Sequence, residues 1–212
     1  MSGTNYVTAK LLDHLLGSGT RNYTSPTVYV ALSSTTPDES GGSVTEPSGG
    51  SYARVSTAGT DWVAAVQGGV TKSVSSITRV GTTATATSTA HGYSNGDWIK
   101  ISGATQSQYN GYFKIQNVTT NTFDYIMTSD PGGSATGSPV CRKVSVVKNN
   151  NPVTFPTATA DWLAAANLTY FLLYDALTSG NALISGALQV AKPVLNGDTA
   201  TFAAGSLVAL ME

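Results

Sequence analysis

Charged side chains are scarce in this chain of 212 residues. They make up 11% of the sequence, less than half of the roughly 25% found in an average soluble protein. The 11 lysines and arginines are balanced by 12 aspartates and glutamates, and Arg142-Lys143 is the only adjacent pair of cations. Proteins that bind DNA, RNA or anionic membranes through charge carry a basic stripe or cluster. The sequence therefore predicts no direct contact with nucleic acid or with a membrane.

Cysteine and long apolar runs are also nearly absent. The single cysteine, Cys141, can form neither an intramolecular disulfide nor a cysteine metal site, so we expect a small buried side chain in a strand. The most apolar stretch, 163–177, is interrupted by Asn167 and Asp175 and is too short to span a bilayer. The N-terminal segment MSGTNYVTAK lacks the pattern of a signal peptide. These absences predict synthesis in a cytoplasm without secretion.

The patterns of the common catalytic sites are missing as well. Neither His14 nor His91 has a second histidine or a cysteine at metal-ligand spacing, so we expect an exposed helix residue and a turn-capping residue. There is no P-loop, dinucleotide fingerprint, G-x-S-x-G elbow or twelve-residue calcium loop. The acidic pair Asp38-Glu39 lies in a predicted exposed loop. We therefore expect no enzyme, and no catalytic, metal-binding or cofactor-binding residue.

Residues 4–17 predict a short amphipathic helix. An i, i+4, i+8 stripe of apolar residues, widened on one side, is formed by Val7, Leu11 and Leu15 with Leu12 and Leu16. Thr4 or Asn5 can cap its start, and Gly17 can supply a left-handed residue after its end. One short helix is not stable alone in water. We therefore expect its stripe to pack on a sheet or on a neighbouring subunit.

The rest of the chain is rich in the residues of short strands and tight turns. Residues 27–33 alternate as a half-buried strand does, and 34–51 read as a long exposed loop. From 73 to 142 short strand candidates follow one another, separated by turn signals such as Asn95-Gly96-Asp97. After residue 142 the strand and loop patterns of the first part of the chain return. The sequence predicts a β-sandwich anchoring domain, 1–72 with 143–212, interrupted by a small immunoglobulin-like or barrel-like domain, 73–142, that projects outward.

Two groups of side chains are candidate contact residues. The helix residues Val7, Leu11 and Leu15, with the strand residues Phe171 and Tyr174, form the expected interface with partner subunits. In the middle domain the candidates are the tyrosines, which could stack on a sugar or could instead fill the core and corners of a small barrel: Tyr93, Tyr109 and Tyr112.

Several segments resemble a known phage family. The opening LLDHLLGSGTRNYTSPTVYVALSSTTP with SYARV, and the later VTFPTATADW, FLLYDA, SGNALISGAL and NGDTATFAAG, are similar to a family labelled phage tail fibre protein. The middle pattern of HG, GD, ISGA, YNG and a final TF resembles a small β repeat of phage tail, spike and capsid-decorating proteins.

The resemblance implies a structural protein of a tailed-phage virion with a jelly-roll-like or related all-β sandwich, assembled as a homotrimer or homodimer. A long fibre would need heptads, collagen triplets or an extended repeat, and none is present. We therefore expect a cement protein that clamps the major capsid protein on the outer surface of the head. The alternative is a tail fibre or baseplate component that contacts host-surface glycans; a sugar-binding or lytic enzyme is a third possibility.

Overall fold

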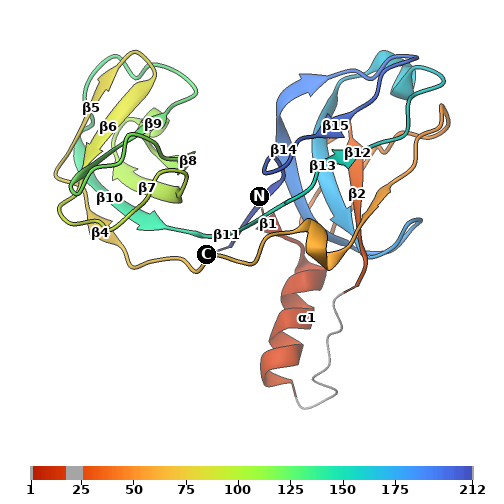
Figure 1. The fold of residues 1–212 in the computed structure, drawn as a ribbon, viewed down its shortest axis with the longest axis horizontal. Coiled ribbons are helices and arrows are strands. Elements are labelled where there is room, and N and C mark those ends of the chain that lie inside the picture. The colour runs from red at the N-terminus through yellow and green to blue at the C-terminus, as the bar shows by residue number, and fades with distance from the viewer. Residues whose placement is uncertain (1, 18–25, 212) are drawn as a thin grey trace. The chain divides into compact units, whose positions relative to one another are not determined.

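The computed structural model describes residues 2–17 and 26–211, which divide into two compact units (Figure 1). Unit 1 consists of the described residues up to Ala64 together with Val147–Met211, and unit 2 is Ala65–Val146. The sequence placed these boundaries at 72/73 and 142/143. Unit 2 is longer at both ends because its first and last segments pair with each other: Val66 bridges Val146, and the Gly69 N–H donates to the Lys143 carbonyl at 2.8 Å.

The larger sheet of unit 1 has five antiparallel strands in the order β1-β14-β13-β2-β3. Their bounds are β1 (Ser2–Gly3), β2 (Val28–Ser33), β3 (Val55–Thr57), β13 (Leu168–Tyr174) and β14 (Ala182–Lys192). The central strand β13 is buried without interruption from Phe171 to Tyr174. Such a continuous apolar run is typical of a strand that is covered on both faces.

A second, less regular layer closes the core of unit 1. It contains the strand pair β12 (Val153–Thr154) with β15 (Thr201–Phe202). A further pair, β11 (Ser145–Lys148) with β16 (Val208–Met211), lies where the chain passes from unit 2 back to unit 1. Two 3-10 helices, η1 (Gly59–Asp61) and η3 (Trp162–Ala165), lie in its connections. The largest buried side chains between the layers are Leu32, Phe155, Trp162, Leu168, Phe171 and Leu207.

Unit 2 consists of two sheets around one core. The first has the order β4 (Lys72–Ser73), β10 (Gly137–Lys143), β7 (Trp98–Ala104) and β8 (Gly111–Lys114), and the second β5 (Ser76–Val80), β6 (Thr83–Thr87) and β9 (Thr122–Ile126). The 3-10 helix η2 (Ser107–Tyr109) connects β7 with β8. Alternate residues of both sheets enter the core, among them Ile77, Ala84, Ile99, Ile101, Phe123, Tyr125 and Cys141.

The predicted fold class, all-β with a short N-terminal helix, is confirmed, with α1 (Asn5–Leu16) as the only α-helix in the described residues. The jelly-roll-like and immunoglobulin-like or barrel-like assignments stay predictions. Cys141 is buried in β10, and the His91 Nδ1 accepts the Tyr93 N–H at 3.0 Å across its turn, so both of these predictions are confirmed. The prediction of a left-handed Gly17 was wrong: its φ is −62° and the chain leaves α1 in an extended conformation.

Within residues 2–17 and 26–211, no helix is both long enough and apolar enough to cross a membrane.

Candidate functional site

The leucines at the far end of α1 are the main exposed apolar surface of unit 1. Leu12, Leu15 and Leu16 are 55%, 64% and 77% exposed. No residue of α1 is fully buried, and the exposure of its apolar side chains increases toward its end. Val7 and Leu11, nearer the start, are half-buried. In Figure 1 the helix extends away from the strands of unit 1. Exposed leucines grouped in this way make the far end of α1 a candidate contact surface.

The start of α1 is fixed to the edge of the large sheet. The buried Thr4 accepts the Val7 N–H as the N-cap, and its hydroxyl donates to the Ala182 carbonyl of β14. The Thr4 N–H donates to the Leu183 carbonyl at 2.9 Å, and the Asn5 N–H to the Glu39 carbonyl at 2.9 Å. Since a cap satisfies backbone groups that the helix leaves open, these bonds set both the start and the direction of α1.

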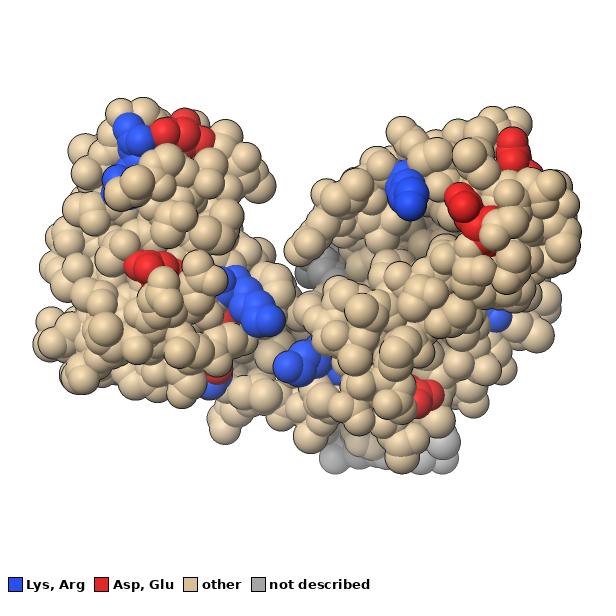
Figure 2. All heavy atoms as spheres, turned by 45° about the horizontal axis from the view of Figure 1, so that its top comes forward, with Lys and Arg blue, Asp and Glu red and all other residues tan. Residues whose placement is uncertain are grey.

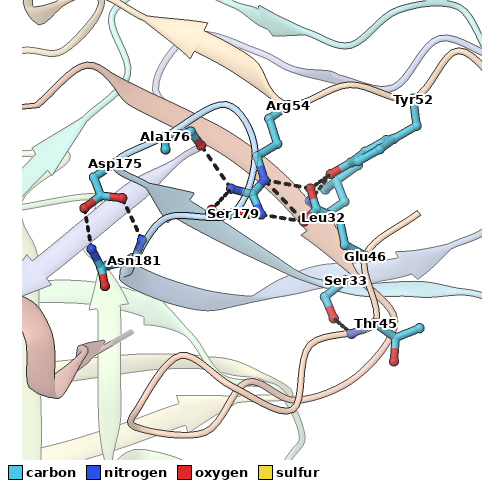
Figure 3. A network of polar contacts seen from close by, with 10 residues as sticks. All are labelled: Leu32, Ser33, Thr45, Glu46, Tyr52, Arg54, Asp175, Ala176, Ser179 and Asn181. Atoms are coloured by element: carbon cyan, nitrogen blue, oxygen red, sulfur yellow. Dashed lines mark hydrogen bonds and ion pairs between the residues drawn. The ribbon is translucent and has the colours of Figure 1, made fainter. Parts of the chain in front are cut away.

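A half-buried ion pair joins the loops beside the start of α1, as Figure 3 shows. The Arg54 guanidinium binds the Glu46 carboxylate with both Nε and Nη2, at 2.9 and 2.8 Å. Its Nη1 donates to the carbonyls of Ala176 and Ser179 at 3.0 and 2.7 Å. The guanidinium also lies 3.5 Å from the centre of the Tyr174 ring. Arg54 therefore joins the loop 34–51 to the turn between β13 and β14.

The pKa values of Arg54 and Tyr52 follow from their surroundings. Burial alone would lower the pKa of Arg54, but the hydrogen bonds and charge of Glu46 outweigh it, and the pKa is raised. Burial, with the Glu46 charge, raises the pKa of Tyr52 far above its ordinary value. Tyr52 is therefore neutral, so that its hydroxyl donates to Glu46 Oε1 at 2.8 Å and accepts the Leu32 N–H at 3.0 Å.

Both loops are further ordered by their own side chains. The Ser33 hydroxyl accepts the Thr45 N–H at 3.2 Å, and the Asp175 carboxylate binds the backbone and side-chain N–H groups of Asn181 at 2.6 and 2.8 Å (Figure 3). Burial acts to raise the pKa of Asp175, but the bonds from Asn181 lower it more. The loop 34–51, expected from sequence to be a long exposed loop, is thus tied by hydrogen bonds to the strands and to the start of α1.

The five predicted interface residues do not form one surface. Val7, Leu11 and Leu15 lie on α1, whereas Phe171 and Tyr174 are interior side chains that are only 5% and 6% exposed. Phe171 packs in the core of unit 1, and Tyr174 lies beneath Arg54. The area left for a partner is therefore on the helix, where Leu12 and Leu16 add to the predicted stripe.

The three predicted ligand-contacting tyrosines are also separated by the fold. Tyr109 is fully buried and its hydroxyl donates to the Gly133 carbonyl. Tyr93 is half-buried, with its hydroxyl 3.4 Å from the Cys141 sulfur, and burial raises its pKa. Tyr112 is 39% exposed. Only Tyr112 therefore presents its ring to solvent.

The sequence reasoning missed the Arg54 network. The motif SYARV contains both Tyr52 and Arg54, but the carbonyls that Arg54 binds belong to a distant part of the chain.

In the described part of the chain no group of three or more His, Cys, Asp or Glu residues is placed to hold a metal ion.

Comparison with known protein families gives a match that covers most of the chain. The family model described as "Podophage GP4 fiber I protein gp80" matches residues 2–102 and 109–209, which include residues of both units. No curated protein matches the chain.

Proposed function

Because the chain belongs to the podophage GP4 fiber I protein gp80 family and so is a structural protein of a phage particle, we propose that it is a fibre component of the tail. The family match supports this alternative better than the capsid cement protein that the sequence reasoning preferred. The absence of heptads and long repeats argues only against an elongated shaft. A chain of two small β units suits an attachment or tip component of a fibre assembly.

The single observation that carries the attachment role is the anchored helix with exposed leucines. Its base is held by Thr4 and by the loop 34–51, whose Glu39 carbonyl accepts the Asn5 N–H, and its far end presents Leu12, Leu15 and Leu16. In the proposal this end docks on an apolar surface of a neighbouring tail protein. The chain then acts by buried contact, without bond-making chemistry.

The first experiment determines where on the phage particle the protein lies. Gold-labelled antibody against the chain should mark the tail of purified virions, in a small number of copies per particle. Uniform labelling of the head with hundreds of copies would identify a cement protein and would overturn the fibre proposal, as would absence from virions.

Two variants test the helix. Leu15→Asp should reduce incorporation into particles at least tenfold while the purified protein unfolds at the same denaturant concentration as the parent. Lys10→Asp, which changes more charge on the opposite side of α1, should be incorporated normally. Normal incorporation of Leu15→Asp, or equal loss in both variants, would refute docking through the leucines.

A further inference from the structure

An apolar groove opens on the surface of unit 1 between β14 and β15. Its volume is about 620 Å³, and its lining is mostly apolar, with Phe171, Leu188, Val190 and Phe202 among the contributing side chains. On the face shown in Figure 2 charged side chains are few and the surface of unit 1 is hollowed. Concave apolar sites of this volume are typical of surfaces that receive a ligand or a partner's side chains.

A change of register within the large sheet produces the groove. Tyr170 of β13 pairs with Ala187 of β14. Two residues earlier in β13, Leu168 pairs with Lys192, which is five residues later in β14. β14 therefore carries three additional residues in this stretch, and such an insertion bends a strand away from its neighbour. Val190 lies in the bulge and is 74% exposed, so the groove has an open apolar rim above the core.

The exposed leucines of α1 have the spacing that fits a helix to such a groove. Leu12, Leu15 and Leu16 stand at positions i, i+3 and i+4, which lie on one face of a helix. Amphipathic helices that bind in apolar grooves place their anchoring side chains at this spacing. The bonds of Thr4 fix the base of α1, and a surface that is ordered beforehand loses less entropy on binding.

The groove of the same chain is out of reach of these leucines. The start of α1 is bound to the carbonyls of Ala182 and Leu183, at the beginning of β14. The groove is lined by the later part of that strand, where Val190 lies seven residues beyond Leu183, roughly 20 Å along a strand. Figure 1 shows α1 extending away from the strands of unit 1. The leucines at its far end therefore lie farther from the groove than its base does.

Charge favours a second copy of this chain as the occupant. Lys192 is exposed and lines the groove. Asp13 is exposed and lies three residues before Leu16, which places it beside the leucines on the helix surface. One chain thus supplies both members of an oppositely charged pair, and opposite charges across a contact fix its register. The whole chain carries a formal charge of only −1, and proteins of nearly zero net charge associate readily.

From these features we propose that α1 of one copy docks in the groove of a second copy, with Asp13 directed to Lys192. The proposal names the neighbouring protein in the proposed fibre function and rests on that function. Each copy offers one helix and one groove, so the contact joins two different surfaces of identical chains. Contacts of this kind repeat from copy to copy and form a ring when the rotation between copies closes. Every copy of the ring covers its leucines and its groove together.

Sedimentation velocity of the purified full-length chain is the first test. We expect the parent to form an assembly of more than one chain, and Leu15→Asp in the helix and Val190→Asp in the groove each to sediment as single, folded chains. Val70→Asp is the matched control, because Val70 is also 74% exposed but lies in unit 2, and it should assemble as the parent does. A parent that sediments as single chains, or equal loss of assembly in Val70→Asp, would overturn the proposal.

Mixing two variants tests which surfaces meet. Leu15→Asp keeps an intact groove and Val190→Asp keeps an intact helix. The mixture should therefore form a complex of one chain of each, although neither variant assembles alone at the same total concentration. Normal assembly of Val190→Asp would show that the helices pair with each other, and a mixture that remains as single chains would exclude the helix-in-groove contact.

Reversal of the two charges gives an independent readout that leaves the apolar side chains in place. Asp13→Lys and Lys192→Asp should each weaken assembly about threefold, as expected for a partly exposed ion pair. The chain that carries both changes should recover the affinity of the parent, because each contact again joins opposite charges from two copies. Equal or greater weakening in the double variant would refute this pairing of helix and groove.

Assembly of copies and the fibre role can fail separately. A protein found on the tail by antibody labelling that sediments as single chains when purified would end this inference and leave the fibre proposal standing, with α1 docked on a different tail protein. A protein that assembles through α1 and the groove but covers the head would overturn the fibre proposal and leave the contact between copies standing.

Discussion

Asn149 and Leu207 hold each other by two hydrogen bonds in the interior of unit 1. The Asn149 N–H donates to the Leu207 carbonyl at 3.1 Å, and the Leu207 N–H donates to the Asn149 side-chain oxygen at 2.9 Å. The side-chain amide nitrogen of Asn149, Nδ2, also donates to the carbonyls of Asn151 and Ala203, at 2.8 and 2.9 Å. Asn149 is 1% exposed, so one buried amide joins two segments of the chain that are far apart in sequence.

Replacing this amide should be among the costliest single changes in unit 1. Asn149→Ala leaves the Leu207 N–H and two carbonyls without their buried partner, so the free energy of unfolding should fall by about 3 kcal/mol. Urea denaturation measures it. Asn150→Ala, at the exposed neighbouring position, should change stability by less than about 0.5 kcal/mol. A loss below about 1 kcal/mol in Asn149→Ala would contradict the assigned role.

The N-cap of α1 gives a second prediction. Thr4→Ala removes the hydroxyl that accepts the Val7 N–H and donates to β14, so we expect a loss of about 1–2 kcal/mol in the free energy of unfolding. Thr4→Ser keeps the hydroxyl and should recover most of this loss. Thr8→Ala, at an exposed position inside the helix, should be neutral or slightly stabilising because alanine favours helices. Equal stability of the two alanine variants would rule out the anchor.

Three successive residues after Trp162 have left-handed backbone conformations, and one substitution should relieve part of that strain. Ala164 has φ 52° and ψ 44°, a region that costs a residue with a Cβ roughly 1–2 kcal/mol. Ala164→Gly should raise the free energy of unfolding by about 1 kcal/mol after the greater entropy of glycine in the unfolded chain is subtracted. Ala160→Gly, at a residue outside the positive-φ set, should lower it instead. Destabilisation by both would contradict this account.

Acid should weaken unit 1 through Asp175. Its pKa is lowered from the ordinary value of 3.8 because Asn181 binds the carboxylate. A carboxyl group whose pKa is lowered by folding stabilises the protein above the unfolded pKa, and this stability is lost as the pH falls through the folded value. Stability measured from pH 5 down to pH 2 should therefore decline below about pH 4. The decline should be shallower in Asp175→Asn, and an identical pH dependence in that variant would argue against the contribution.

The local patterns of the sequence were sufficient for the fold class and for most of the strands. Alternation at 28–33, the apolar run at 168–174 and the turn signals between 73 and 142 each depend on neighbouring residues, and each corresponds to a strand or turn in the structure. The helix was predictable for the same reason, since its cap at Thr4 and its leucine stripe lie within a few turns of the chain.

The sequence by itself determined that this is an all-β chain with one short helix that carries a stripe of leucines, because strand alternation and helix periodicity are properties of nearby residues. Only the tertiary structure decided which of the predicted interface residues stay exposed: Phe171 lies in the core of unit 1 and Tyr174 beneath the Arg54 guanidinium, whereas Leu15 of α1 remains exposed. It also decided that Lys100 and Arg142 are neighbours, since the pairing of β7 with β10 joins residues that are distant along the chain.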